Sequence, residues 1–492
     1  MNSMDIELVI GLEVHVQLAT RTKLFCGCPT EFGAPPNTQV CPVCLGHPGT
    51  LPVLNSRAVE LAIQTGVALN CQIAELTKWD RKNYFYPDLP KGYQISQFDK
   101  PICGPGWLEF PDREDPQGTL KVRFVRAHLE EDAGKSMHDE QGGRADSRID
   151  LNRAGTPLLE IVTEPDLRSP QAAKAFLTEL RLLLTYLGVS DCNMQEGSLR
   201  VDANVNLHII DGGRRLATPI VEVKNLNSFR AVERALAYER ERQWESWRET
   251  GQLLGDVPKQ TRGWDENQGV TLPQREKEES SDYRYFPDPD LVPLQIDPQQ
   301  VQRVRQAVAM RPLELRRKLQ HEYGIKPYDA DVIVAQGRSL VEYFETAVAA
   351  GGPPKRVSSW IQQDVLRTLN ETGQTLEEFA VTAERLAVLL QAVEAGELEN
   401  SRARDVFQYW LQHPMDDLAA AKGALGIQDV DETDLVELCR DLLHEHPQIV
   451  QQAQAGDMKG LGALIGAAKK RNPNVDPRKV RAICQQLIES GF

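Results

Sequence analysis

Hydrophobic and polar residues alternate in short runs over the first 295 or so positions of the chain. Examples are IELVIGLEVHVQL, TLKVRFVRAHL, SLRVDANVNLHII and TPIVEVKNL, which are separated by turns rich in Pro, Gly and Asp. A period of two is typical of strands that bury one face. Residues 169–187 and 230–250 instead have the spacing of amphipathic helices. These patterns predict a largely antiparallel sheet with helices packed on it.

The pattern changes after the proline-dense stretch YRYFPDPDLVPLQIDPQQ, near residue 295. Beyond it, segments such as VQRVRQAVAMRPLELRRKLQHEYG and SLVEYFETAVAA have helical periodicity. A second break is expected at LQHPMDD, residues 411–417. The predicted fold class is α+β: a sheet domain over residues 1–295, an all-α domain over 296–410 and a small helical tail over 411–492.

Composition and charge narrow the classes of protein to which the chain can belong. Its 492 residues are 41% hydrophobic and 26% charged, as in globular proteins of several domains. No apolar run reaches membrane-spanning length and no secretory leader is visible, so we expect a cytoplasmic protein without a membrane partner. The net charge of −15 repels nucleic acid at long range. DNA is therefore not an expected partner, and any RNA contact needs a local basic surface or a second protein.

Four of the nine cysteines are clustered in the segment FCGCPTEFGAPPNTQVCPVC. Cys26 and Cys28 form one close pair, and Cys41 and Cys44 form another. Two chelating pairs joined by a loop of Pro, Gly and Asn are typical of a tetrahedral zinc site. Four thiolates leave no open coordination position, so the ion would be structural. The alternative is four unrelated buried thiols, which the clustering beside Pro and Gly does not favour.

Polar residues share one face of three predicted strands. They are carboxylates, an imidazole, several amides and a lysine: Glu13, His15 and Gln17; Asp202, Asn204 and Asn206; Glu222 and Lys224. A fourth strand ends in the acidic triplet Glu130, Glu131 and Asp132. If the strands are neighbours, this inventory suits Mg²⁺ and nucleotide phosphates. It is equally what the solvated face of an antiparallel sheet contains, and the pattern alone leaves both interpretations open.

Motifs for other chemistry are missing from the sequence. The segment DAGKS resembles the end of a P-loop, but the position five before Gly134 is Leu129 instead of glycine. There is no GxSxG elbow, no Ser-rich amidase stretch and no leading catalytic cysteine, so nothing in the chain predicts release of ammonia from glutamine. The aromatic and basic run over residues 78–100 could stack on and pair with a nucleotide or an RNA end, or could be a packing loop.

Eight segments, in order, resemble the GatB family of tRNA amidotransferase subunits. Among them are VIGLEVHVQL, HLEEDAGKSMH, DLNRAGTPLLEIVTEPDLRSP, EGSLRVDANVN and SDYRYFPDPDLVP, and together they cover most of residues 5–295. The remainder resembles the helical and YqeY-like regions of the family, most clearly in GDMKGLGALIGAAKKRNPNVDPRKVRAICQQLI. The resemblance implies an N-terminal cradle domain that uses ATP and Mg²⁺ to phosphorylate the side-chain carboxylate of Glu on tRNA(Gln) or Asp on tRNA(Asn).

The resemblance also implies partners and site residues. The family's GatA amidase subunit supplies ammonia through a channel and a small GatC subunit wraps the pair, so the whole acts as an ATP-dependent carbon–nitrogen ligase. Matching positions assign activation, ATP and Mg²⁺ roles to Glu13, His15, Lys82, Glu131, Glu160 and Asp202, and less specific roles to Glu222 and Lys224. Of these, His15, Glu131 and Glu160 are expected to hold the Mg²⁺.

The tail carries a basic run on an otherwise acidic chain. Its six cations are Lys469, Lys470, Arg471, Arg478, Lys479 and Arg481. We expect them to contact tRNA phosphates, with a solvated helix end as the alternative. Two alternatives to the whole assignment also stand: a zinc-stabilised RNA-binding scaffold with an inert polar face, and an enzyme that acts on a free amino acid.

Overall fold

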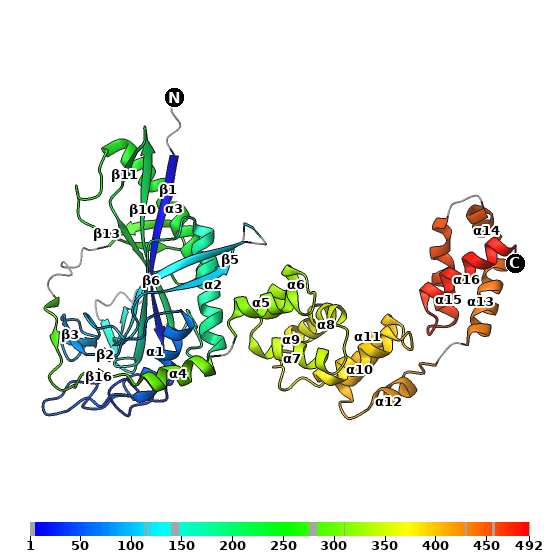
Figure 1. Cartoon of the computed structure of the whole chain (residues 1–492), viewed down its shortest axis with the longest axis horizontal. Helices are drawn as coiled ribbons and strands as arrows, with labels where there is room; N and C mark the ends of the chain where they lie inside the picture. Colours follow the sequence, from blue (N-terminus) through cyan, green and yellow to red (C-terminus); the bar gives the residue numbers. More distant parts are fainter. Residues whose placement is uncertain are drawn as a thin grey trace. The chain divides into compact units, whose positions relative to one another are not determined.

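The structure is a computed structural model that describes residues 5–112, 114–115, 118–138, 147–274, 283–308, 310–428, 431–454 and 458–491. The chain divides into two compact units, Met1–Arg317 and Lys318–Phe492. The first unit contains the sheet and its helices, and the second is helical (Figure 1). This α+β arrangement is the predicted fold class.

Within the described residues, twelve strands of the first unit form one sheet, in the order β14-β13-β12-β10-β1-β9-β6-β4-β3-β15, with β11 added to β10 and β5 added to β6. Their bounds are β1 Asp5–Gln17, β3 Asp80–Asn83, β4 Tyr93–Ser96, β5 Gly106–Pro111, β6 Thr119–Glu131, β9 Pro157–Thr163, β10 Leu199–Asp211, β11 Arg214–Ala217, β12 Val221–Lys224, β13 Gln260–Asp265, β14 Val270–Pro273 and β15 Phe286–Pro287. Neighbouring strands are antiparallel except for the parallel pair β12–β13. Two short pairs lie outside this sheet: β2 Leu76–Thr77 with β16 Leu294–Gln295, and β7 Lys135–His138 with β8 Ser147–Asp150.

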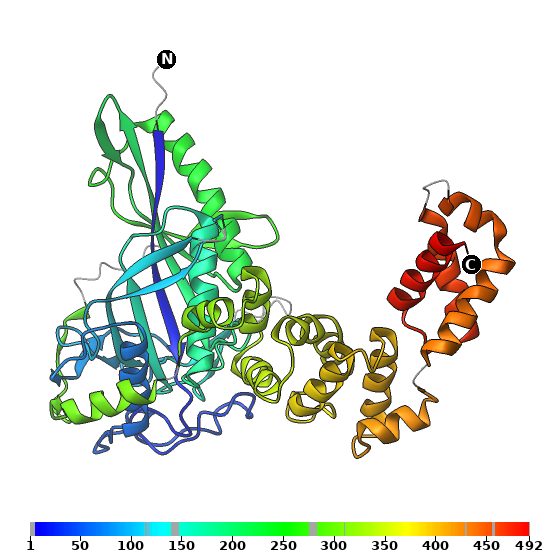
Figure 2. The same cartoon turned by 45° about the vertical axis from the view of Figure 1, so that its right-hand side comes forward.

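The apolar face of the sheet packs against three helices. Leu12, Val14 and Val16 of β1 are almost fully buried in one core with residues of α1 Ser56–Ala68, α2 Pro170–Tyr186 and α3 Phe229–Thr250. Figure 1 and Figure 2 show the long strand β1 passing through the middle of this unit beside β10. Because one face of β1 is held in this core, its Glu13, His15 and Gln17 are directed to the other face.

The starts of these helices follow from local sequence signals. Ser169 and Ser228 accept hydrogen bonds from the backbone N–H groups three residues further on, at Ala172 and Ala231, and so cap α2 and α3. Pro170 occupies the first turn of α2, where a missing N–H costs nothing. The helices predicted at 169–187 and 230–250 are therefore confirmed, with bounds shifted by at most one residue.

The first unit continues beyond the last strand. Helix α4, Pro298–Ala307, follows β16 and packs Val301 and Val304 against the sheet core. Helix α5, Pro312–His321, begins in the same unit. The change of pattern near residue 295 thus coincides with the end of the last strand, while the compact unit runs on to Arg317. The three-part division at 295 and 410 stays a prediction.

The second unit consists of helices. They are α6 Pro327–Ala335, α7 Arg338–Ala349, α8 Pro354–Trp360, the π-helix η2 Ile361–Val365, α9 Leu366–Thr372, α10 Ala383–Glu394, α11 Asn400–Gln412, α12 Leu418–Ala424, α13 Glu432–Glu445, α14 Pro447–Gln454, the short η3 Met458–Gly460, α15 Leu461–Arg471 and α16 Pro477–Ser490. The last of these, from α13 onward, share a core of their own around Leu443, Leu464 and Val480. Across the described part of the chain, no helix combines the length and apolar character that a membrane span requires.

Candidate functional site

A belt of polar side chains crosses the face of the sheet opposite the helices. Strand pairing aligns the positions: Glu13 is opposite Asp202 of β10, and His15 is opposite Glu160 of β9. Strand β6 continues the row, since His128 is opposite Glu160. The polar residues predicted to share one face of three strands therefore lie on adjacent strands, with β9 and β6 extending the belt toward β4 and β3.

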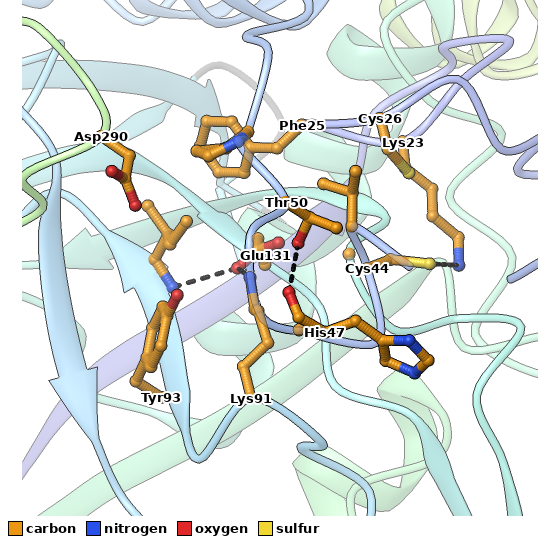
Figure 3. A pocket seen from close by; sticks show the side chains of 15 residues that line it. Lys23, Phe25, Cys26, Cys44, His47, Thr50, Lys91, Tyr93, Glu131 and Asp290 are labelled. Atoms are coloured by element: carbon orange, nitrogen blue, oxygen red, sulfur yellow. Dashed lines mark hydrogen bonds and ion pairs between the residues drawn. The ribbon is translucent and has the colours of Figure 1, made fainter. Parts of the chain in front are cut away.

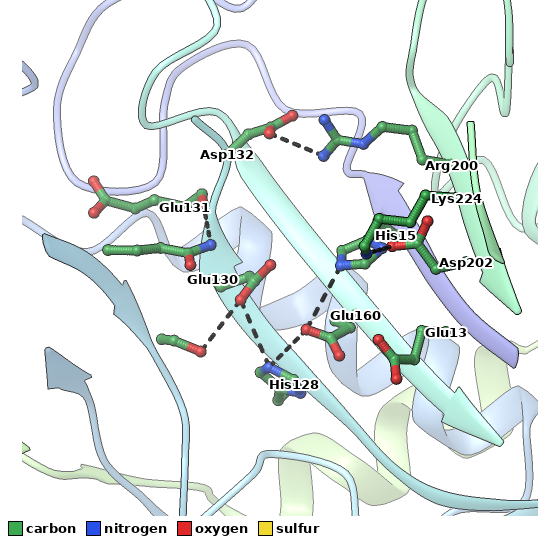
Figure 4. A network of polar contacts seen from close by, with 12 residues as sticks. Glu13, His15, His128, Glu130, Glu131, Asp132, Glu160, Arg200, Asp202 and Lys224 are labelled. Carbon is green, nitrogen blue, oxygen red and sulfur yellow. Dashed lines mark hydrogen bonds and ion pairs between the residues drawn. The ribbon is translucent and has the colours of Figure 1, made fainter. Parts of the chain in front are cut away.

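One group of charged side chains lies at the centre of the belt (Figure 4). Ligand atoms of His15, Glu130 and Glu160 all lie within 4.8 Å of one another. The His15 Nε2 atom is 3.7 Å from Glu160 Oε2, and His128 Nε2 is 3.4 Å from that same oxygen and 3.7 Å from Glu130 Oε2. Two carboxylates and an imidazole that converge in this way are a donor set that fits a divalent cation.

Glu130, at the centre of this group, is charged although it is buried. Burial alone would raise the pKa of Glu130, but the hydrogen bond from His128 and the charges of Lys82 and His15 outweigh burial and lower this pKa to about 2. Burial likewise disfavours the ammonium of Lys82, yet the nearby acidic groups, Glu130 first and Glu160 among them, raise its pKa above the ordinary value. The fold therefore brings the predicted Lys82, on β3, to the same group as His15 and Glu160.

A second acidic group lies on the same face of the sheet, on the neighbouring strands β1, β10 and β12. Carboxylate oxygens of Glu13, Asp202 and Glu222 lie within 4.8 Å of one another. The Lys224 ammonium is between two of them, 2.6 Å from Asp202 Oδ2 and 2.8 Å from Glu222 Oε1. Burial opposes the charge of Lys224, but these two carboxylates raise its pKa. Direct ion pairs with Lys224 therefore offset part of the negative charge of this second group.

Glu131 does not join either group. Its carboxylate is paired with the Lys91 ammonium, and Glu131 Oε2 accepts a hydrogen bond of 3.1 Å from the backbone N–H of Ile95. Successive residues of a strand point to opposite sides, so Glu130 faces His15 while Glu131 faces away. Glu131 instead lines a pocket together with Lys91, Tyr93, Lys23 and Cys44 (Figure 3). In the central group, Glu130 occupies the place that the sequence-based expectation gave to Glu131.

Two further residues of the belt were not singled out from the sequence. His128 lies in a segment of which only the acidic end was considered a candidate. The alternation Ala127–His128–Leu129–Glu130 nevertheless places His128 on the same face of the strand as Glu130. Arg200 donates to Asp132 Oδ1 at 2.9 Å (Figure 4). Its position two residues before Asp202 on β10 is a signal that could have identified it, since the two must share a face.

The four predicted zinc ligands are brought together. The Sγ atoms of Cys26, Cys28, Cys41 and Cys44 lie within 4.8 Å of one another. The hydrogen bond from Cys26 is the largest influence on Cys44 and, with the charge of Lys23, lowers its pKa to about 4 against the effect of burial. Four converging sulfurs, one of them stabilised as thiolate, fit a structural zinc ion.

The predicted basic run divides between two helices of the tail. Lys469, Lys470 and Arg471 occupy the last turn of α15, where cations are favoured by the helix dipole, and Arg478, Lys479 and Arg481 lie in the first half of α16. Lys469 Nζ is 3.5 Å from Glu399 Oε1, and Arg471 is paired with Glu445. The other four side chains are on exposed residues.

Comparisons with known proteins cover both units. Residues 8–302 match the family described as the GatB/GatE catalytic domain, and residues 342–488 match the family described as the GatB domain. The chain is 58% identical over 480 residues to the B subunit of the aspartyl/glutamyl-tRNA(Asn/Gln) amidotransferase of Rhodopirellula baltica, an alignment that covers 98% of this chain and 96% of that protein. A protein with the same name from a Thermoanaerobacter species is 45% identical, in an alignment that covers 95% of this chain and 96% of that protein. Another, from Thermodesulfovibrio yellowstonii, is 43% identical, in an alignment that covers 99% of this chain and all of that protein.

Proposed function

The chain belongs to the GatB family of amidotransferase B subunits, and on this premise we propose that it activates misacylated tRNA for amidation. The substrate class is Glu-tRNA(Gln), Asp-tRNA(Asn) or both, and the overall reaction is that of an ATP-dependent carbon–nitrogen ligase. The observation that carries the proposal is the convergence of His15, Glu130 and Glu160 near the half-buried Lys82, whose charge Glu130 and Glu160 favour.

This donor set suits phosphoryl transfer. Mg²⁺, when bound with ATP, would neutralise phosphate charge and align the transferring group. His15, Glu130 and Glu160 are the residues that would hold the ion, because they offer two anionic oxygens and one nitrogen that converge. Lys82, whose charge is maintained by these same carboxylates, is placed to offset negative charge that builds up on the phosphoryl oxygens.

The proposed reaction has two steps. A side-chain carboxylate oxygen of the tRNA-bound Glu or Asp attacks the γ-phosphorus of ATP, the bond from that phosphorus to the β–γ bridging oxygen breaks, and ADP leaves. Ammonia then attacks the carbonyl carbon of the acyl phosphate, the bond from that carbon to the phosphate oxygen breaks, and a proton is lost as amide and phosphate form. Activation is needed because a carboxylate is a poor electrophile, whereas phosphate is a good leaving group.

The second acidic group has a different role in this proposal. Glu13, Asp202 and Glu222 surround Lys224 and lie beside the central group on the same strands. We assign them to positioning: Asn204 donates to Glu13 at 2.9 Å and Lys224 ties β12 to β10. This network fixes β1, and with it His15, at the centre of the belt.

Ammonia must come from another chain, since the sequence carries no glutaminase motif. The proposed partners are the GatA amidase subunit, as the source of ammonia, and the GatC subunit, as a third component. The four-cysteine knuckle is assigned to structural zinc, and the exposed cations of α15 and α16 to tRNA. A cytoplasmic location accords with a role in translation.

The test is ATP turnover in the reconstituted three-subunit complex. The expected result is ADP formation that is stimulated by misacylated tRNA, with hydroxylamine trapping the activated carboxylate in the absence of glutamine. His15→Ala should remove both signals. His208→Ala, at the far end of β10 on the same sheet face, is the matched control and should retain them. ATP turnover that does not respond to misacylated tRNA, or survives His15→Ala, would refute the proposal.

A further inference from the structure

Two cysteines outside the four-cysteine knuckle face each other in the core of the tail. Cys439 lies in the middle of α13 and Cys484 in the middle of α16, two helices that pack side by side (Figure 1). Both residues belong to the core that the tail forms on its own, where they are 0% and 1% exposed. The two residues therefore meet inside one bundle, although α14 and α15 lie between them in the chain.

The sulfur atoms of this pair are in direct contact. The two thiols are hydrogen-bonded to each other. The thiol of Cys439 also lies 3.8 Å from the carbonyl oxygen of Val480, to which it donates. Val480 is one helical turn before Cys484 on the same face of α16. Neighbouring sulfurs on two packed helices can form a disulfide with little movement of the backbone.

The hydrogen bond between the thiols makes them chemically unequal. It lowers the pKa of Cys439 against the effect of burial. The same hydrogen bond, together with burial, raises the pKa of Cys484. Cys484 therefore keeps its proton and donates it, while Cys439 is the sulfur that more readily becomes a thiolate. Because the thiolate is the nucleophilic form of cysteine, reaction with an oxidant begins at Cys439.

The other three cysteines outside the knuckle, all in the described part of the first unit, have the opposite character. Burial raises the pKa of Cys71 to about 12 and that of Cys192 to about 11, and it raises the pKa of Cys103 as well. Cys71 and Cys103 share one core, but their thiols donate to the carbonyl oxygens of Leu69, at 3.8 Å, and Ala62, at 3.5 Å. These protonated thiols provide an internal comparison for the pair in the tail.

We propose that Cys439 and Cys484 are a reversible dithiol–disulfide pair, with Cys439 as the attacking sulfur, and that the disulfide fixes α16 on α13. The oxidant is a hydroperoxide, of which hydrogen peroxide is the simplest. The proposal goes beyond the activation of tRNA and does not depend on it. Disulfides of proteins in a reducing compartment are usually transient, so we expect the dithiol to be the resting state.

The reaction removes two electrons from the pair and passes them to the peroxide. The Cys439 thiolate attacks one peroxide oxygen, the O–O bond breaks, and the leaving hydroxide takes up a proton to give water. The sulfur of Cys484 then attacks the sulfur of the resulting sulfenic acid. The S–O bond breaks, and a second water leaves with the proton of the Cys484 thiol. A dithiol reductant reverses the reaction by thiol–disulfide exchange.

Burial determines when the pair reacts and what the disulfide does. Because both cysteines are enclosed, peroxide reaches them only when the bundle opens locally. All six cations of the basic run, on α15 and α16, lie between the two cysteines in the chain. The disulfide would close this segment into a loop, and such a link stabilises a fold by restricting its opened state. Oxidation therefore preserves the basic surface of the tail.

The test is applied to the full-length protein purified with its partner subunits. It is treated with hydrogen peroxide under native conditions, its remaining thiols are blocked, and its peptides are analysed by mass spectrometry without reduction. We expect a peptide pair linked through Cys439 and Cys484, free thiols at Cys71 and Cys103, and recovery of the dithiol with dithiothreitol. The unfolding midpoint of the tail should rise by on the order of 10 °C on oxidation.

Two results of this mapping would overturn the proposal. One is the recovery of Cys439 and Cys484 as free thiols at a peroxide dose that modifies the half-buried Cys28 of the knuckle. The other is the oxidation of both residues to sulfinic acids without a link between them.

Single substitutions that keep the core apolar test the order of the two steps. In Cys484→Ala the sulfenic acid has no partner sulfur, so dimedone, which reacts with sulfenic acids, should label Cys439. In Cys439→Ala, Cys484 should stay unlabelled. Both variants should lose the gain in thermal stability on oxidation, whereas Cys192→Ala, which removes a buried thiol from the first unit, is the control and should keep it. Label on Cys484 but not on Cys439, or an equal gain in all three variants, would overturn the proposal.

Discussion

Glu130 and Glu131 are adjacent in sequence, but their carboxylates lie on opposite sides of strand β6. Glu130 lies 3.7 Å from His128 Nε2 within the group that contains His15, while Glu131 accepts from Lys91 and from the backbone N–H of Ile95. Both side chains are almost fully buried. The two residues therefore have separable roles, which the following substitutions can distinguish.

Glu130→Gln should weaken the use of Mg²⁺, because it removes an anionic oxygen from the convergent donor set. Even outer-shell partners of a metal ligand affect metal affinity by about 10- to 100-fold, so the Mg²⁺ concentration that gives half-maximal amidation should rise at least about tenfold. Glu131→Gln is the matched control and should keep the original Mg²⁺ requirement, whatever it does to the rate. Equal shifts in the two variants would contradict the division of roles.

His15→Ala should separate activation from ammonia release. The imidazole is 3.7 Å from Glu160 and belongs to the group that we propose for phosphoryl transfer, a step that glutamine hydrolysis does not use. Amide formation on tRNA should fall on the order of 100-fold, as expected for loss of a metal ligand. Basal glutaminase activity of the partner subunit should remain. The measurement is glutamate release beside amidated tRNA in one preparation, with His208→Ala as the control.

Cys41→Ser should release zinc and destabilise the N-terminal region, because an incomplete thiolate set holds the ion poorly. The measurements are metal content of the purified protein and its thermal unfolding temperature. Cys71→Ser, a buried cysteine outside the knuckle, should retain zinc even if its stability falls. A wild-type protein that contains no zinc after purification without chelators would contradict this assignment.

Lys23 should contribute to the affinity of the same site. It is fully buried, and its ammonium lies 3.6 Å from Cys44 Sγ and 2.7 Å from the carbonyl oxygen of Gln39. Four thiolates around a divalent ion carry a net negative charge, which a buried cation offsets. Lys23→Met, which keeps the length of the side chain, should raise the dissociation constant for zinc by roughly tenfold or more. Competition with a chromogenic chelator measures this, and Lys91→Met, which lies in the same pocket but pairs with Glu131 instead of a cysteine, is the control.

The sequence pattern predicts part of this site well and part of it poorly. The period of two in β1, β10 and β12 places Glu13, His15, Asp202 and Lys224 on one face, because the opposite face supplies the core. The position of Glu160 could not be obtained in this way. Its strand, PLLEIVT, is almost continuously apolar and has no alternation, so only the resemblance to a family pointed to it.

The order of the strands is the main feature that local sequence does not determine. Strand β9 lies between β1 and β6, which brings Glu160 between His15 and His128, but no local signal specifies these long-range pairings. The same applies to the parallel pair β12–β13 and to the stack of Phe98 on Tyr285. The spacing of the motif did predict that the four cysteines converge, because these residues are close together in the chain.

The tail should bind tRNA mainly through charge, and its structure refines which residues to change. Lys469 and Arg471 are engaged with Glu399 and Glu445, so reversing them would also break contacts within the protein. Lys470, Lys479 and Arg481 are exposed and provide a cleaner test. Reversing these three to Glu should raise the KM for misacylated tRNA and reduce the slope of log affinity against log salt by roughly one for each lost phosphate contact.

The matched control for the tail reverses three exposed arginines of α3, Arg230, Arg240 and Arg248, which changes the net charge equally. If the tail acts locally, the control should retain most of the tRNA affinity and its salt dependence, because screening confines surface charges to about 10 Å at ordinary ionic strength. The KM values for ATP and glutamine should be unaffected in both variants. Equal losses of tRNA affinity in the two triple variants would mean that total charge, not the basic surface of α15 and α16, attracts the RNA.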